Sequence, residues 1–174
     1  MRRFAFVVSL LLACLPSAAL AGIGPPDTVI VVVRHAEKAA DDPKDPSLSE
    51  AGQARAEALA VALKGLPLQH AISTQYKRTR DTAAPAAKAA GIDVHVKPVD
   101  AANSATYAKD LAAHIRQDHA GQNLLIVGHS NTVPEIVQAF TGVAPAPMAD
   151  DEFDRIYVVT LPADGPARFV VLKY

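Results

Sequence analysis

Two histidines each follow directly on an apolar run. Residues 28–33, TVIVVV, lead into Arg34 and His35, and residues 123–128, NLLIVG, lead into His129. Unbroken apolar runs of this kind are typical of strands that are buried on both faces of a parallel sheet. Because ligands of such sheets bind at the carboxyl ends of the strands, we expect both imidazoles at one edge of the sheet.

Arginines accompany the two histidines. Arg34 precedes His35, and a third short strand, expected at residues 71–73, leads into a segment that contains Arg78 and Arg80. A guanidinium group binds phosphate oxygens in a bidentate manner, and a neutral imidazole is a nucleophile. These residue types at one sheet edge favour chemistry on a phosphoryl group.

A metal site is the main alternative from the residue types alone. His35, His129 and Glu37 could form a three-ligand zinc site at the same edge. The other four histidines are expected to be structural or surface residues, because a single histidine usually is. They are His70, His95, His114 and His119.

The rest of the chain predicts strands that alternate with helices. Ser49 is typical of a helix N-cap, and Gly91 of the residue that ends a helix. Helices are expected at about 50–65, 77–90, 107–120 and 133–140, a short edge strand or extended loop at 92–99, and a terminal hairpin at 155–161 and 168–172. This order predicts an α/β fold, a three-layer α/β/α sandwich with a mostly parallel central sheet and a C-terminal antiparallel hairpin.

The first helix is expected to bury one face against the sheet. Its apolar residues recur at three- and four-residue spacing, as in an amphipathic helix. The expected core face consists of Ala51, Ala54, Ala58, Leu59, Ala62 and Leu63. Arg55 and Glu57 lie outside this set.

Composition and charge narrow the class of protein. The 174 residues contain 17 Lys and Arg against 18 Asp and Glu, with a formal net charge of −1. Because no run of five like charges occurs, the sequence does not have the basic pattern of a nucleic-acid-binding protein. The single cysteine rules out an internal disulfide and a thiolate zinc site.

The N-terminal segment resembles a secretory signal peptide. Two arginines precede an apolar run at residues 4–15 and the small-residue sequence at 19–21, ALA. We predict cleavage after Ala21, which leaves residues 22–174 as one exported domain, periplasmic or secreted. In the alternative, residues 11–14 act as a lipobox, and lipidated Cys14 anchors the protein to a membrane. A retained transmembrane anchor is the weakest interpretation, because the run is shorter than the roughly 18–20 residues that span a bilayer.

Four short segments carry a resemblance to a known family. They are VVRHAE at residues 32–37, DPSLSEAGQARA at 45–56, STQYKRTRDTA at 73–83 and VGHSN at 127–131. In order and spacing they are similar to motifs of the histidine phosphatase superfamily, and more specifically of its phosphoglycerate-mutase-like branch. An RH dipeptide alone is weak evidence, but the four segments together are specific.

The resemblance implies a two-step phosphoryl transfer that needs no cofactor and no metal. His35 would attack phosphorus and carry a covalent phosphoryl group. Arg34, Arg78 and His129 would bind the phosphate oxygens and stabilise the charge of the transition state. Water would then release phosphate.

This chain departs from the family pattern at two places, the proton-donating acid and the residue six positions after the nucleophile. An acidic residue is expected after the third strand, and Asp100 is the best candidate there. Glu37 is an alternative because it is close to His35, and short members of the phosphohistidine phosphatase type have no such acid. The mutases commonly have an asparagine six residues after the nucleophile, where this chain has Asp41, so their substrate contacts are not expected.

These observations predict an exported phosphatase for a small or envelope-borne phosphomonoester. A non-catalytic module that binds a phosphorylated ligand with the same fold is the alternative, and a periplasmic metal-binding protein is a third hypothesis. A mutase is disfavoured, because residues 22–174 contain no large insertion that could form a lid. The loops at 38–48, 100–106 and 142–153 are expected to select the substrate.

Overall fold

The computed structural model describes residues 26–174. The predicted signal peptide at residues 1–21 and Cys14 of the alternative lipobox lie outside the described residues. Cleavage and lipidation therefore stay predictions. Within residues 26–174, no helix is both long enough and apolar enough to cross a membrane.

One six-stranded sheet forms the centre of the described structure, in the order β3-β2-β4-β1-β5-β6. Its strands are β1 Thr28–Arg34, β2 His70–Ser73, β3 Val94–Val96, β4 Asn123–Gly128, β5 Arg155–Leu161 and β6 Arg168–Lys173. Strands β1 to β4 run parallel to one another, whereas β5 runs antiparallel to both β1 and β6. The predicted edge strand and terminal hairpin are both present.

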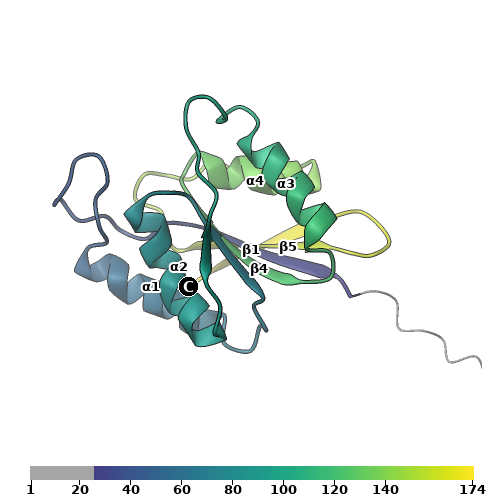
Figure 1. Cartoon of the computed structure of the whole chain (residues 1–174), viewed down its shortest axis with the longest axis horizontal. Helices are drawn as coiled ribbons and strands as arrows, with labels where there is room; N and C mark the ends of the chain where they lie inside the picture. Colours follow the sequence, from purple (N-terminus) through teal and green to yellow (C-terminus); the bar gives the residue numbers. More distant parts are fainter. Residues whose placement is uncertain (1–25) are drawn as a thin grey trace, which may run out of the picture.

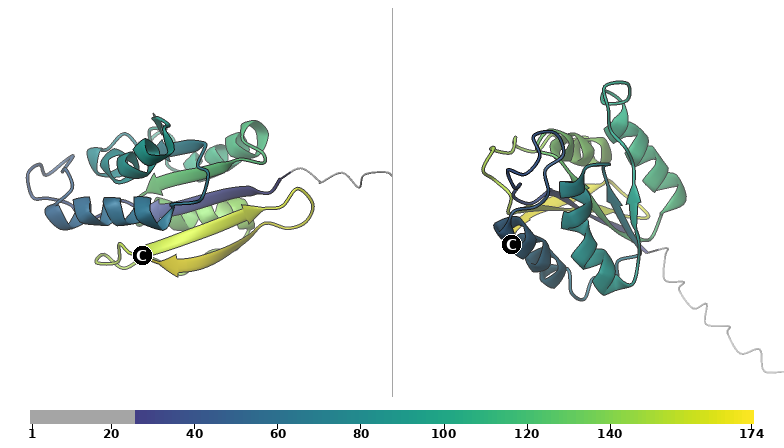
Figure 2. Two further views of the ribbon diagram at one scale, coloured as in Figure 1. Left: turned by 90° about the horizontal axis from the view of Figure 1, so that it is seen from below. Right: turned by 60° about the vertical axis from the view of Figure 1, so that its left-hand side comes forward.

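Four helices cover the two faces of the sheet (Figure 1, Figure 2). They are α1 Glu50–Ala62, α2 Lys77–Ala90, α3 Tyr107–Asp118 and α4 Thr132–Thr141. One hydrophobic core joins the sheet to α1 and α2, and a second joins it to α3 and α4. The three-layer α/β/α sandwich predicted from the sequence is confirmed.

Strand β1 is buried on both faces, as its unbroken apolar sequence predicts. Ile30 and Val32 belong to the core under α3 and α4, and Val31 and Val33 to the core under α1 and α2. All four side chains are at most 1% exposed. Burial of each contributes about 1.5–3 kcal/mol relative to an exposed position, so β1 and its neighbour β4 are strongly held in the middle of the sheet.

The capping residues are those that the sequence predicts. The side chain of Ser49 accepts a hydrogen bond from the N–H of Gly52 at 3.1 Å at the start of α1. Gly91 ends α2 in the left-handed conformation, with φ of 69°, which only glycine adopts without strain. These two caps fix the start of α1 and the end of α2.

The predicted core face of α1 is wrong. Leu59 and Leu63 are buried as expected, but the inward face is completed by Gly52 and Ala56. The four alanines expected in the core are exposed, namely Ala51, Ala54, Ala58 and Ala62. Alanines occur all around this helix and therefore do not mark a face, and the close packing of Gly52 on Glu37 sets its rotation instead.

Candidate active site

The strand register brings the two predicted histidines together. Arg34 is paired with Gly128 across β1 and β4, so the residues that follow each strand are adjacent. The backbone N–H of His35 donates to the carbonyl oxygen of Gly128 at 2.9 Å. The imidazole rings of His35 and His129 lie in an edge-to-face arrangement, with 5.4 Å between their centroids.

All five residues predicted to form the site line one open pocket of about 520 Å³. They are Arg34, His35, Arg78, Asp100 and His129. Lys38 and Asp150 also line this pocket. The pocket lies at the carboxyl ends of β1 and β4, which is the edge that a parallel sheet uses for ligands.

His35 is held as a neutral ring with one free nitrogen. Its Nδ1 atom donates to the backbone carbonyl of Ala36 at 2.8 Å, because a carbonyl oxygen can only accept. The unprotonated nitrogen is therefore Nε2. Burial lowers the pKa of His35 to about 3, and the positive charges of His129, Arg78 and Arg34 act in the same direction. A neutral imidazole with Nε2 free is a competent nucleophile at neutral pH.

A threonine on α2 fixes the loop that holds His35. The N–H of Ala36 donates to the hydroxyl oxygen of Thr82 at 2.9 Å, and this hydroxyl donates to the carbonyl of Arg78 at 2.7 Å. Ala36, whose carbonyl orients His35, is thus held through its N–H by the helix that carries Arg78. Sequence reasoning missed this role, although Thr82 lies within the third motif.

The guanidinium group of Arg34 is clamped on one side and unpaired on the other. Its NH1 atom donates to the carbonyls of Ala149 at 2.8 Å and Glu152 at 3.0 Å. The ring of Phe153 stacks on it, 4.2 Å from the centroid to Cζ. Its Nε atom is buried and has no hydrogen-bond partner among residues 26–174.

Arg78 has a similar environment. Its guanidinium lies over the ring of Tyr76, with Cζ 4.3 Å from the centroid, and its only ion pair in the described structure is a long one of 4.0 Å to Asp45. Its Nε atom is also buried without a partner in the described part of the chain. Burial lowers the pKa of both Arg34 and Arg78. Two incompletely paired cations whose Nε atoms are buried line one pocket, and this favours an anionic ligand.

His129 is oriented by buried threonines. Its Nε2 atom lies 3.0 Å from the hydroxyl oxygen of Thr74, and its backbone N–H donates to the hydroxyl oxygen of Thr132 at 2.9 Å. Burial lowers the pKa of His129 to about 4, with Arg78 and Arg34 as further causes. The free protein therefore holds His129 neutral at pH 7.

Of the two candidate proton donors, only Asp100 lines the pocket. Asp100 is exposed, and its Oδ1 atom accepts the N–H groups of Ala102 at 2.8 Å and Asn103 at 3.2 Å, which holds the carboxylate at the rim. Glu37 instead forms a bidentate pair with Arg55, with N–O distances of 2.7–2.9 Å. This pairing lowers the pKa of Glu37 and keeps the group ionised.

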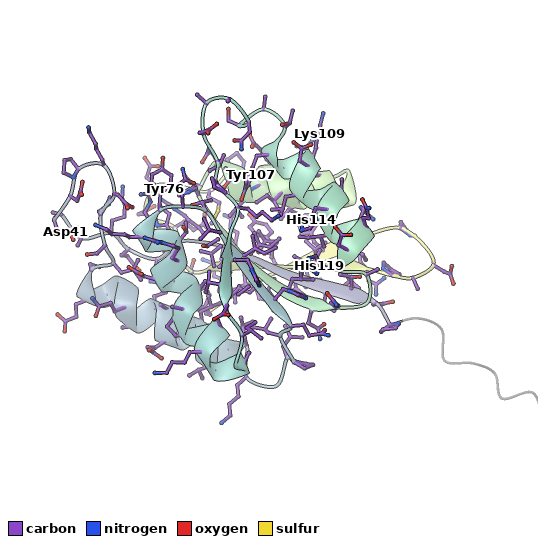
Figure 3. All side chains as sticks on the ribbon, in the orientation of Figure 1. Asp41, Tyr76, Tyr107, Lys109, His114 and His119 are labelled. Atoms are coloured by element: carbon purple, nitrogen blue, oxygen red, sulfur yellow. The ribbon has the colours of Figure 1, made fainter. Side chains whose placement is uncertain are left out.

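The remaining polar candidates lie outside the pocket. Asp41 accepts two hydrogen bonds from Ser47 in the loop between β1 and α1, where Figure 3 labels it. Among the other histidines, the rings of His70 and His119 pack with 4.2 Å between centroids, and His119 and His114 lie on or next to α3 (Figure 3). Within residues 26–174, no three His, Cys, Asp or Glu side chains form a group that could hold a metal ion.

Comparisons with known proteins agree with this fold. A family model described as the histidine phosphatase superfamily (branch 1) matches residues 30–99, which include His35, Arg78 and the first three motifs. No curated protein matches the sequence.

Solved structures match over most of the chain at low sequence identity. A mycobacterial glucosyl-3-phosphoglycerate phosphatase is 15% identical with a TM-score of 0.65, over 85% of this chain and 98% of that one. The protein histidine phosphatase SixA, complexed with tungstate, is 20% identical with a TM-score of 0.63, over 83% and 96%. A phosphoserine phosphatase from Entamoeba histolytica is 14% identical with a TM-score of 0.63, over 84% and 97%. The chain thus has the histidine phosphatase fold, and the resemblance to that superfamily predicted from its motifs is confirmed.

Proposed function

We propose that this protein is a phosphatase that hydrolyses a phosphomonoester without a cofactor, through a phosphoryl group carried on His35. One arrangement is the main support. A neutral His35 with Nε2 free shares a pocket with Arg34 and Arg78, and the Nε atom of each arginine is buried without a partner in residues 26–174. Nucleophile and oxyanion ligands are the two groups that phosphoryl transfer needs.

In the first step, Nε2 of His35 attacks phosphorus while the bond from phosphorus to the ester oxygen breaks. The new N–P bond joins the phosphoryl group to His35, and the alcohol leaves after its oxygen gains a proton. Arg34, Arg78 and His129 bind the non-bridging oxygens, where negative charge must be stabilised. The two arginines are already oriented by Phe153 and Tyr76, so little reorganisation is needed.

In the second step, water attacks the phosphoryl group and the N–P bond breaks. The electron pair of that bond returns to Nε2 of His35, and inorganic phosphate leaves the pocket. Because the proton stays on Nδ1, hydrogen-bonded to the Ala36 carbonyl oxygen throughout, the same tautomer is ready for the next substrate.

Asp100 is the proton donor that we propose for the leaving alcohol, and later the base for water. Its position in the wall of the pocket supports this role. Glu37 is unsuitable, because its carboxylate is bound to Arg55 and does not line the pocket. We assign Glu37 to orienting the loop after His35.

We also propose that the protein acts outside the cytoplasm, on the strength of the signal-like sequence at residues 1–21. The described chain begins next to Thr28, at the opposite end of β1 from Arg34 and the pocket. The substrate that we propose is a small or envelope-borne phosphomonoester.

The test is hydrolysis of p-nitrophenyl phosphate by residues 22–174, with and without EDTA, beside His35→Ala. We expect turnover that survives the chelator and is lost in the variant, and a phosphoryl group on His35 detected by mass spectrometry after an alkaline quench. Turnover that EDTA abolishes would contradict the mechanism. Phosphate binding without turnover in both proteins would instead indicate a binding module.

A further inference from the structure

Behind His129 lies a pair of buried threonines that the proposed mechanism does not use. Thr74 and Thr79 are both 0% exposed. Their hydroxyl oxygens lie 2.9 Å apart, and that of Thr74 lies 3.0 Å from Nε2 of His129. Neither threonine lines the pocket, so their effect on a ligand must pass through the imidazole ring.

We assign the direction of each hydrogen bond by counting the protons available. The hydroxyl of Thr79 lies 2.8 Å from the carbonyl oxygen of Tyr76. The same hydroxyl lies 3.2 Å from the carbonyl oxygen of Thr74. Carbonyl oxygens can only accept, and two of them lie within reach of the single proton of Thr79, so we take Thr79 as the donor to a carbonyl. The hydroxyl of Thr74 must then donate to Thr79, since otherwise two oxygen lone pairs would face each other in a buried site.

With its proton given to Thr79, Thr74 can only accept from His129. Nε2 of His129 therefore carries the proton, and in the neutral ring Nδ1 does not. This is the reverse of His35, where Nδ1 carries the proton and Nε2 is free. The two facing imidazoles are thus held in opposite tautomers by different partners.

We propose that Thr74 is a positioning residue that makes His129 bind a phosphoryl oxygen as a cation. Nδ1 has no hydrogen-bond partner among residues 26–174 and is the nitrogen left for a ligand, but in the neutral ring it cannot donate. When a tetrahedral dianion enters, Nδ1 of His129 takes up one proton. The resulting Nδ1–H group donates a hydrogen bond to an anion oxygen, while Nε2 keeps its hydrogen bond to Thr74. This inference rests on the proposed function, because it concerns how the same pocket holds its anion.

Charge in the pocket is consistent with proton uptake that depends on the ligand. The groups that face His129 are the rings of His35 and Tyr76 and the cations Arg34 and Arg78. In the free protein these cations and burial disfavour a second positive charge on the imidazole. A bound dianion offsets both cations, so the imidazolium becomes favourable only in the complex.

The first measurement reads the tautomer directly in the ligand-free protein. Long-range ¹H–¹⁵N correlation spectra of histidine-labelled protein near neutral pH should show His129 protonated at Nε2 and bare at Nδ1. Thr74→Ser should preserve this pattern, and Thr74→Val should shift the ring toward the Nδ1–H form. A wild-type His129 with Nδ1–H would overturn the proposal, whatever the activity of the protein.

The second measurement counts protons by calorimetry of tungstate binding in buffers of different ionisation enthalpy. At about pH 8 tungstate is a dianion, so any proton taken up goes to the protein. We expect Thr74→Val to take up one proton fewer per tungstate than the wild type, and Thr74→Ser to match it. Equal uptake by Thr74→Val and the wild type would overturn the proposal.

Kinetics supply a third readout. Thr74→Val should lower kcat/KM roughly tenfold, the size expected for loss of a hydrogen bond to a charged group, with rescue by Thr74→Ser. Failure of turnover in all three proteins, with the tautomer as expected, would contradict the proposed phosphatase but not the role of Thr74. Thermal melting of Thr74→Val checks that its fold is intact.

Discussion

The α-carbon of Gly52 lies directly against the backbone carbonyl of Glu37. A Cβ atom at residue 52 would collide with the Glu37 oxygen and lie 3.1 Å from the Glu37 nitrogen. The N–H of Ser49 donates to the same oxygen at 2.9 Å. The first turn of α1 therefore holds the backbone two residues after the proposed nucleophile.

Gly52→Ala should disturb this contact and the loop beyond it. Because the clash is with backbone, which cannot move aside like a side chain, we expect a loss of about 1–3 kcal/mol in the free energy of unfolding. The activity should also fall, because a displaced Glu37 would shift the loop that carries His35, two residues earlier in the chain. Urea denaturation and kcat/KM measure the two effects. Ala54→Ser, at an exposed position of the same helix, is the control, and equal stability of the two variants would contradict the packing argument.

Arg34→Lys tests whether the planar guanidinium is required. Lysine cannot both stack on Phe153 and donate to Ala149 and Glu152 while it contacts phosphate. We expect kcat/KM to fall by about 10²–10³, which is the usual loss for one oxyanion donor. The matched control is Arg80→Lys, because Arg80 is exposed and does not line the pocket. Similar activity in both variants would show that the Arg34 guanidinium does not bind the phosphate.

The two buried histidines should make the protein less stable in mild acid. Their pKa values are lowered from 6.5 to about 3 for His35 and about 4 for His129. Between these values and 6.5 the unfolded chain binds more protons than the folded one. Their contribution to stability is therefore fully present above about pH 6.5 and is lost as the pH falls toward the folded-state values.

The double variant His35→Asn, His129→Asn should show a flatter profile. Each histidine contributes a slope of up to about 1.4 kcal/mol per pH unit, so the difference should be clear between pH 7 and pH 5 in urea denaturation. His95→Asn, at an exposed position, is the control and should follow the wild type. An unchanged slope in the double variant would show that these histidines are protonated in the folded protein.

The proposed role of Asp100 predicts a dependence on the leaving group. A poor leaving group needs a proton from a general acid and a good one does not. Asp100→Asn should therefore slow hydrolysis of an alkyl phosphate by roughly 10²–10⁴ and that of p-nitrophenyl phosphate much less. Glu37→Gln should affect both substrates alike, because Glu37 does not line the pocket. If Asp100→Asn slows both equally, Asp100 is not the acid.

Much of the site could be predicted from local sequence. The apolar runs before His35 and His129 predict buried parallel strands, and such strands end at a common edge, so the two histidines were expected to meet. Ser49 and Gly91 predict helix ends because a cap depends on residues within one turn. The positions of Arg34, Arg78 and Asp100 around one pocket follow from the same strand order.

The tertiary structure decided what local patterns do not encode. The rotation of α1 could not be predicted, because alanines surround the helix and the determining contact is a backbone clash with Glu37. Arg34 is clamped by the carbonyls of Ala149 and Glu152, more than 110 residues away along the chain. Contacts over such separations leave no periodic signal in the sequence.

The protonation states of the two histidines are also features that local sequence patterns do not encode. The sequence by itself determined that imidazoles and guanidinium groups stand at one sheet edge. Only the tertiary structure decided that the Ala36 carbonyl contacts Nδ1 of His35, whereas the Thr74 hydroxyl contacts Nε2 of His129. Burial and hydrogen-bond partners set a tautomer, and both arise only once the chain has folded.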